Sequence, residues 1–217
     1  AQVLGMKKFI DTSDVPLTQL STADSATQKE YQKIILITAP SGSGKTSIVK
    51  HLLKKFPLLS FSVSATTRPP RKNEKEGKDY YFISEDDFKE KIHSKEFLEW
   101  EMVYEGKYYG TLKSDIERIW KEKKVPVLDI DVQGAIHVQQ QYPKNTIAIF
   151  VQAPSIDELK RRLQLRGSET EESLQARLNK STYEMTFKNQ FENIIVNENF
   201  DDACKETGKI IAKFLND

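Results

Sequence analysis

The stretch ITAPSGSGKT, residues 37–46, decides the fold of this chain. It continues an apolar run, IILI at residues 34–37, which is typical of a buried β-strand. A helical pattern begins at Lys45, directly after the glycines. A strand, a glycine-rich turn and a helix N-terminus in this order form an anion-binding cradle, because backbone N–H groups point inward and the helix dipole favours negative charge. The residues therefore predict a phosphate-binding loop.

Lys45 and Thr46 extend this prediction to a nucleoside triphosphate. The Lys45 ammonium is placed to reach the β- and γ-phosphates, and the Thr46 hydroxyl is placed to ligate Mg²⁺. The segment matches the Walker A pattern G-x-x-x-x-G-K-[ST] except at Ala39, a minor steric change if this residue keeps a negative φ. The alternative is a chance glycine-rich turn, which the strand-to-helix context disfavours. The loop residues that we expect to contact ATP are Ser41, Gly42, Ser43, Gly44, Lys45, Thr46 and Ser47.

The composition limits the classes of partner. The chain has 217 residues with 33 basic and 32 acidic side chains, so no overall charge favours nucleic acid or a membrane surface. No apolar run approaches the roughly 20 residues of a membrane-spanning helix. Cys204 is the only cysteine, which excludes an internal disulfide and a cysteine-rich metal site. We expect a cytoplasmic protein that binds small molecules; its oligomeric state stays open.

The order of the predicted elements indicates an α/β fold. Residues 1–32 are polar without a sustained period, which predicts a tail; Met6 is a candidate natural start, with residues 1–5 as a cloning remnant. From Lys33 onward strands and helices alternate, which predicts a parallel sheet covered by helices on both faces. Residues 78–110 instead contain closely spaced β segments and one helix, which predicts a small, mostly antiparallel insertion.

Two local expectations concern element boundaries. The second strand of the chain is expected at residues 61–64, where Phe and Val alternate with Ser. Ser114 is expected to cap a helix that ends near Lys123.

A second set of polar side chains suits a phosphate monoester. Arg68 and Arg71 lie on a loop stiffened by prolines, and Tyr80 and Tyr109 follow. Arginine pairs with phosphate oxygens in a bidentate manner, and a phenol hydroxyl adds a donor. The alternative is a solvated loop, in which such arginines contribute little.

Glu99 lies within the otherwise apolar run FLEW, residues 97–100. A carboxylate in such surroundings is costly unless it is satisfied, and guanine offers two adjacent donors, N1–H and the exocyclic amine. The alternative is an outward-facing strand residue, which period-two alternation allows.

From Lys33 to the C-terminus the chain resembles the guanylate kinases, P-loop enzymes that transfer a phosphoryl group from ATP to GMP. The matching segments are APSGSGKT, FSVSATTRPPR, GKDYYFIS, EFLEW, YYGT, LDIDVQG, APS, RGSETEES and IIVNE, in that order. Jointly these segments are highly specific, although the short ones mean little alone.

The resemblance implies a role for each matching residue. Guanine would be contacted by Ser64, Glu99, Thr111 and Asp131, with Thr111 replacing a more usual serine. The GMP phosphate would be held by Arg68, Arg71, Tyr80 and Tyr109. The water shell of Mg²⁺ would be oriented by Asp129 or Asp131.

The resemblance also implies a lid that carries arginines. Arg162 and Arg177 would contact the transferring phosphates, and with Lys45 they are the expected catalytic residues. Arg166 would pack near adenine, and Asn197 would flank the adenine site. Besides Ala39, the departures from the family pattern are Ala65 and Leu165, and none of them removes a charged group.

These implications divide the chain into parts with separate tasks. The expected core comprises residues 33–63, 112–157 and 186–217. A GMP-binding insertion of mixed α+β structure is expected at residues 64–111, and a helical lid at residues 158–185. The expected activity is γ-phosphoryl transfer from ATP to GMP, and also to dGMP, with Mg²⁺ and closure of the lid.

Two other functions are alternatives. A non-catalytic module of this fold that binds protein partners would tend to lack a working P-loop, whereas Lys45 and Thr46 are present. A kinase of the family that acts on a ribose phosphate would not need the guanine-reading residues Glu99, Thr111 and Asp131. Both alternatives are therefore less favoured than a GMP kinase of purine nucleotide metabolism.

Overall fold

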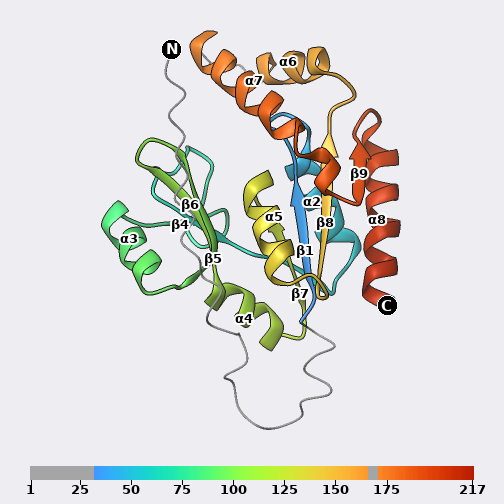
Figure 1. Ribbon diagram of the computed structural model, residues 1–217. Coiled ribbons are helices and arrows are strands. Elements are labelled where there is room, and N and C mark those ends of the chain that lie inside the picture. Colours follow the sequence, from blue (N-terminus) through green and yellow to red (C-terminus); the bar gives the residue numbers. More distant parts are fainter. Residues whose placement is uncertain (1–31, 166–170) are drawn as a thin grey trace.

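The computed structural model describes residues 32–165 and 171–217, and these ranges form an α/β fold (Figure 1). The predicted tail falls almost entirely on residues 1–31, and Arg166 falls on the second gap, so both predictions lie outside the described residues.

A parallel sheet forms the centre of the fold. Its strands follow the order β2-β7-β1-β8-β9, and every neighbouring pair is parallel. The strands are β1 (Ile34–Thr38), β2 (Leu59–Phe61), β7 (Val125–Asp129), β8 (Thr146–Gln152) and β9 (Asn193–Val196). All five residues of β1 are buried, which fits a central strand covered on both sides. The predicted parallel sheet is confirmed.

Helices cover both faces of this sheet, as predicted. Ile35 and Ile37 of β1 pack on the face covered by α2 (Lys45–Lys55) and α8 (Phe200–Asn216), where Cys204 is also buried. Ile34 and Leu36 pack on the opposite face, against α4 (Lys113–Lys121) and α5 (Val132–Gln141). Because side chains alternate along a strand, the run of isoleucine and leucine in β1 supplies both cores.

A second, smaller sheet lies beside the first one (Figure 1). Its strands are β3 (Ser64–Thr66), β4 (Tyr81–Phe82), β5 (Phe97–Tyr104) and β6 (Lys107–Leu112), in the order β4-β3-β6-β5. Two of its pairings are antiparallel, and β3 pairs with β4 in parallel. Helix α3 (Glu85–His93) covers it through Phe88, which stacks on Phe97 at 4.3 Å between ring centroids.

Two further helices lie at the end of the parallel sheet toward which its strands point (Figure 1). These are α6 (Ile156–Gln164), which the Ser155 side chain caps as predicted, and α7 (Glu171–Met185). They pack on each other through Leu159, Leu163, Leu174 and Leu178, a cluster separate from the two sheet cores. A short 3₁₀ helix, η1 (Lys188–Gln190), leads from α7 to β9.

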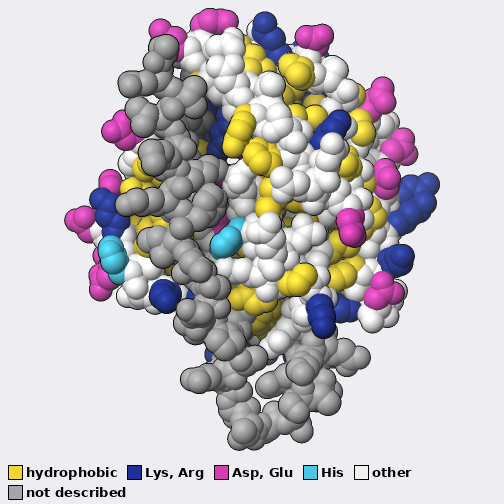
Figure 2. All heavy atoms as spheres, viewed as in Figure 1, with side chains coloured by type: hydrophobic (Ala, Val, Ile, Leu, Met, Phe, Trp, Pro, Cys, Tyr) yellow, Lys and Arg dark blue, Asp and Glu magenta, His cyan; other side chains and the backbone are white. Residues whose placement is uncertain are grey.

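The surface carries both signs of charge. On the face seen in Figure 2, acidic and basic side chains are interspersed, as the nearly balanced composition predicts. No helix within the described ranges combines the length and the apolar character that crossing a bilayer requires.

The predicted strand at residues 61–64 is wrong, because the chain changes sheets there. The Ser62 N–H still donates to the Val127 carbonyl at 3.0 Å, but the Val63 N–H donates to the Asp115 carboxylate at 2.9 Å. Residues 59–61 therefore belong to β2, and residues 64–66 belong to β3 in the smaller sheet. This switch joins the two sheets within a few residues.

The predicted Ser114 cap is also wrong. Helix α4 begins at Lys113 directly after β6, its N-cap residue is Leu112, and no side chain caps it. Tertiary contacts replace the cap, because α4 buries Ile116 and Ile119.

Leu52→Ala is predicted to lower the free energy of unfolding by about 2–5 kcal/mol, because a buried leucine loses its contacts and leaves a cavity. Leu52 is fully buried on α2 against the parallel sheet. Leu58→Ala is the matched control, since the Leu58 side chain is 39% exposed. Denaturant unfolding measures both variants, and equal losses would contradict the assigned core.

Candidate nucleotide-binding site

A cavity of about 300 Å³ opens at the carboxyl end of the parallel sheet and extends to the small sheet. Its walls come from the loop after β1, the residues at the end of β7, strands β3, β5 and β6, and helix α7. The polar lining residues that the sequence predicted are Ser41, Ser43, Lys45, Thr46, Ser64, Arg71, Tyr80, Glu99, Tyr109, Asp129, Asp131 and Arg177. Residues far apart in the chain thus meet in one hollow.

The loop after β1 has the backbone that its glycines allow. Gly42 and Gly44 adopt φ of 92° and 93°, a region that side chains disfavour. Among the described residues, positive φ outside glycine occurs at Lys95 and Lys123, so Ala39 keeps a negative φ and meets the condition set for it. The Asn197 amide donates to the Ser43 carbonyl at 2.7 Å and fixes the loop from β9.

Lys45 lies at the first turn of α2 and reaches the end of β7. Its ammonium donates to the Ile130 carbonyl at 2.9 Å and pairs with the Asp129 carboxylate at 2.5 Å. Burial by itself lowers the pKa of Lys45, but the charge and hydrogen bond of Asp129 outweigh it and raise the pKa above its ordinary value. Lys45 is therefore a cation at neutral pH.

Thr46 and Asp129 bring hard oxygen atoms together. The Thr46 hydroxyl lies 3.5 Å from the second Asp129 oxygen. Asp131 follows two residues later and caps α5, where its carboxylate accepts the Gly134 N–H at 2.7 Å. A hydroxyl and nearby carboxylates are the kind of donors that Mg²⁺ prefers.

Glu99 faces the cavity and does not point outward to solvent. Its carboxylate is 8% exposed and accepts the Thr111 hydroxyl at 2.6 Å. Burial raises the pKa of Glu99 to about 7, against the hydrogen bond from Thr111. Helix α5 approaches it so closely that a Cβ on Gly134 would lie 2.7 Å from the Glu99 carboxylate. The outward-facing alternative for Glu99 is therefore wrong.

The two loop arginines have different surroundings. Arg71 is exposed and lines the cavity, as do Tyr80 and Tyr109. Arg68 is 8% exposed and, among the described residues, does not belong to the cavity lining. Its Nε donates to the Tyr109 hydroxyl at 3.0 Å, and both of its terminal nitrogens donate to Glu74, a residue that the sequence analysis did not single out.

Helix α7 adds charged groups to the cavity wall. Arg177 was predicted, whereas Lys180 and Glu184 were missed. Their spacing of three and seven residues from Arg177 places them on the same helix face, which is the signal that would have found them. Glu184 is 6% exposed, and burial raises its pKa.

Some predicted residues lie away from the cavity. Among the described residues, Thr111 and Arg162 are not part of its lining. Arg162 donates to Glu158 at 2.6 Å and to the Asn197 carbonyl at 2.9 Å. Thr111 is fully buried behind Glu99. Ser47 is likewise outside the lining, although its N–H bonds to Gly44 within the loop helix.

The parallel sheet, the glycine loop after its central strand and the adjoining cavity define a P-loop nucleotide-binding protein. The sequence profile of the guanylate kinases matches residues 31–214. The chain therefore belongs to the guanylate kinase family.

Individual relatives agree with this assignment. A guanylate kinase of Bacteroides thetaiotaomicron is 45% identical over 184 residues, which cover 85% of this chain and 90% of the relative. A guanylate kinase of Thermotoga maritima is 45% identical over 179 residues, which cover 82% of this chain and 86% of the relative. The crystal structure of guanylate kinase from Anaplasma phagocytophilum superposes with a TM-score of 0.68 at 29% identity, covering 83% of this chain and 85% of that chain.

Glu99→Gln is predicted to stabilise the protein at high pH and not at low pH. The folded protein favours protonated Glu99, whose pKa of about 7 exceeds the ordinary 4.5, so its stabilising contribution is greatest below pH 4.5 and is lost as pH rises to 7. Glutamine avoids this loss. Melting temperatures from about pH 5 to about pH 8 measure the difference, with Glu90→Gln on exposed α3 as control. A difference that does not vary with pH would contradict the assigned pKa.

Proposed function

We propose that this protein is a guanylate kinase that transfers the γ-phosphoryl group of ATP to GMP, giving ADP and GDP. One observation carries the proposal: the P-loop and the buried carboxylate of Glu99 open into the same cavity. A site that held ATP alone would not need a second polar wall with a carboxylate suited to guanine.

The P-loop end of the cavity suits ATP. Residues 41–47 form the loop and the helix N-terminus at this end, where anions are favoured. Lys45 is already held at the cavity wall, and we propose that its ammonium exchanges part of its contact with Asp129 for the β- and γ-phosphates. Asn197 supports the loop through the Ser43 carbonyl, and we propose that it flanks the adenine.

The small-sheet end suits GMP. We propose that Glu99 accepts N1–H and the exocyclic amine of guanine, with Ser64 and Asp131 beside it. Thr111 orients Glu99 from behind. The donors of guanine favour the ionised carboxylate, so binding would lower the raised pKa of Glu99. Arg68, Arg71, Tyr80 and Tyr109 are the proposed set for the GMP phosphate. Of these, Arg71, Tyr80 and Tyr109 line the cavity, and Arg68 would act from behind them through Tyr109.

The chain's oxygen donors fit Mg²⁺. We propose that the Thr46 hydroxyl binds the ion and that Asp129 or Asp131 acts through its water shell. When bound, Mg²⁺ would neutralise charge on the transferring phosphate oxygens. Within the described ranges, no group of three or more His, Cys, Asp or Glu side chains forms a separate metal site.

Charge neutralisation and positioning account for the proposed catalysis. Phosphoryl transfer passes through a loose, in-line transition state, and the acceptor phosphate is already anionic, so no general base is assigned. Lys45 and Arg177 lie at the cavity and would offset repulsion between the nucleotides. Arg162 would join them after leaving Glu158.

We further propose that residues 64–111 form the GMP-binding insertion and residues 158–185 the lid, which carries Arg166 near adenine. Closure would exclude water and limit hydrolysis of ATP. We propose dGMP as a second acceptor and a cytoplasmic location, which the single cysteine supports.

Lys45→Ala is predicted to lower kcat at least a hundredfold, since one preorganised cation at the transferring phosphates is lost. A coupled assay of ADP release measures the effect, and circular dichroism checks the fold. Lys50→Ala, on the exposed face of the same helix, is the control and should keep the wild-type rate. A wild-type kcat for Lys45→Ala would refute the assigned role.

A panel of acceptors tests the proposed function against its alternatives. With ATP and Mg²⁺, we expect ADP release with GMP first and dGMP next, and little release with AMP or ribose phosphates, because Glu99 reads the guanine edge. Release with a ribose phosphate alone would favour the second alternative. No release with any acceptor, from folded protein, would favour the non-catalytic module.

A further inference from the structure

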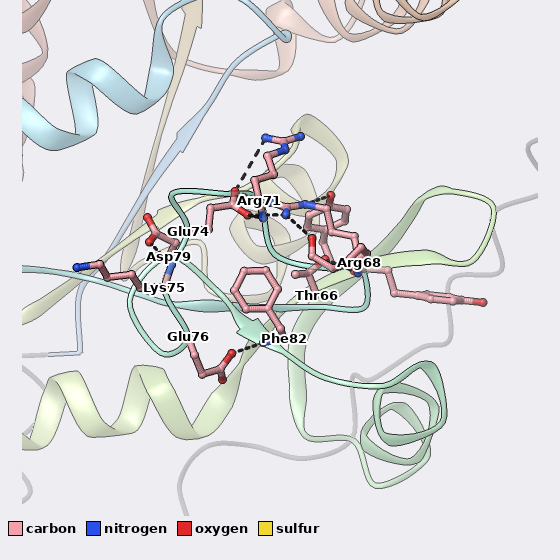
Figure 3. A network of polar contacts seen from close by, with 11 residues as sticks. Thr66, Arg68, Arg71, Glu74, Lys75, Glu76, Asp79 and Phe82 are labelled. Carbon is pink, nitrogen blue, oxygen red and sulfur yellow. Dashed lines mark hydrogen bonds and ion pairs between the residues drawn. The ribbon is translucent and has the colours of Figure 1, made fainter. Parts of the chain in front are cut away.

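Glu74 lies between the two loop arginines and contacts both of them (Figure 3). Its carboxylate oxygens accept Arg68 Nη1 at 2.6 Å and Arg68 Nη2 at 2.7 Å, a bidentate pair. It also accepts the Arg71 backbone N–H at 2.9 Å and lies 3.9 Å from the Arg71 guanidinium. One carboxylate thus contacts both loop arginines.

Arg68 is held on every edge of its guanidinium. Besides the pair with Glu74, Nη1 donates to the Pro69 carbonyl at 3.0 Å and Nε donates to the Tyr109 hydroxyl at 3.0 Å. The guanidinium carbon lies 4.9 Å from the centre of the Tyr80 ring. A guanidinium fixed in this way and largely buried has one orientation.

The contacts connect Glu74 with the cavity by two routes. Tyr109 and Arg71 both line the cavity, whereas Arg68 and Glu74 lie behind them. Arg68 Nε donates to a lone pair of the Tyr109 hydroxyl oxygen, so the hydroxyl hydrogen is left to donate to another group. Because Tyr109 lines the cavity, that hydrogen can be donated to a ligand in the cavity. The backbone bond to Glu74 fixes the start of the Arg71 side chain.

We propose that Glu74 is a positioning residue for the acceptor phosphate: it orients the Tyr109 hydroxyl through Arg68 and holds Arg71 directly, so that both meet the phosphate of GMP preorganised. The inference rests on the proposed function, because it assigns Glu74 to the acceptor end of that site.

Charge supports the assignment. The hydrogen bond from Arg68 holds the pKa of Glu74 below its ordinary value, so the carboxylate is ionised at neutral pH. Breaking the pair would leave a largely buried guanidinium without its strongest partner. The arginine would then reorient, and Tyr109 would lose its fixed donor direction.

Glu74→Gln tests the proposal, because the amide keeps the shape and loses the bidentate charged pair. We expect the KM for GMP to rise about tenfold, the size expected for one lost charge-assisted hydrogen bond, while the KM for ATP stays within twofold of wild type. Glu76→Gln is the matched control: Glu76 lies on the same loop but accepts the Phe82 backbone N–H at 3.0 Å, which an amide oxygen also accepts (Figure 3). It should keep both KM values.

A double-mutant cycle separates positioning from a general loss of structure. If Glu74 acts mainly through Arg68, adding Glu74→Gln to Arg68→Ala raises the KM for GMP by less than it does in the wild type. Where Arg68→Ala does not fold, Arg68→Lys replaces it, since lysine keeps the charge and loses the planar fork. Denaturant unfolding accompanies each variant, so that all KM values come from folded protein.

Three results would overturn the inference: an unchanged or lower KM for GMP in Glu74→Gln, an equal rise for both nucleotides, or full additivity with the Arg68 variant. Assaying the wild-type protein with GMP separates this test from the test of the proposed function. If the wild type does not phosphorylate GMP, the proposed function fails; if it does and Glu74→Gln matches it, only the role of Glu74 fails.

Discussion

Coulomb repulsion between two phosphate groups is the constraint around which this site is built. Bringing two polyanionic nucleotides together requires cations at short range, held so that no reorganisation is needed when the substrates arrive. In the structure, three of the cations proposed for this task are paired with carboxylates: Lys45 with Asp129, Arg68 with Glu74 and Arg162 with Glu158. The carboxylates keep the cations ordered and offset their mutual repulsion. When a phosphate binds, each cation would then exchange or share its carboxylate partner, and mobile side chains would not first have to be ordered.

The fold explains how Lys45, Asp129 and Glu99 come to face one cavity. In a parallel sheet the carboxyl ends of the strands share one edge, so the loop after β1 and the end of β7 bring Lys45 and Asp129 together. The change of sheet between Ser62 and Ser64 places the small sheet, with Glu99, beside that edge. Helix α7 closes the remaining side with Arg177 and Glu184. Because these walls belong to separate packing clusters, the cavity is formed by parts that each hold their own shape.

Sequence reasoning reached those features that local chemistry determines. The glycine loop, the buried β1 and the parallel order follow from short motifs and periodicity, and the structure has all of them. It failed where a tertiary contact overrides local pattern, as when the Asp115 carboxylate takes the Val63 N–H and redirects a predicted strand. It also missed Glu74, because a charged residue on a loop gives no local sign of the arginine with which it will pair. It missed Glu184 as well, although the spacing of seven residues from Arg177 places Glu184 on the same helix face. For Glu99 the alternation of the strand allowed both orientations, and only the packing of α5 against it decides between them.

The central claim is that one cavity holds both nucleotides with their phosphates facing each other. The most direct measurement uses a single molecule in which adenosine and guanosine are joined through a pentaphosphate chain. Titration calorimetry with Mg²⁺ should give one molecule bound per chain, and saturating ATP or saturating GMP should each displace it. Displacement by only one of the two nucleotides would contradict the account, because the two sites would then not adjoin.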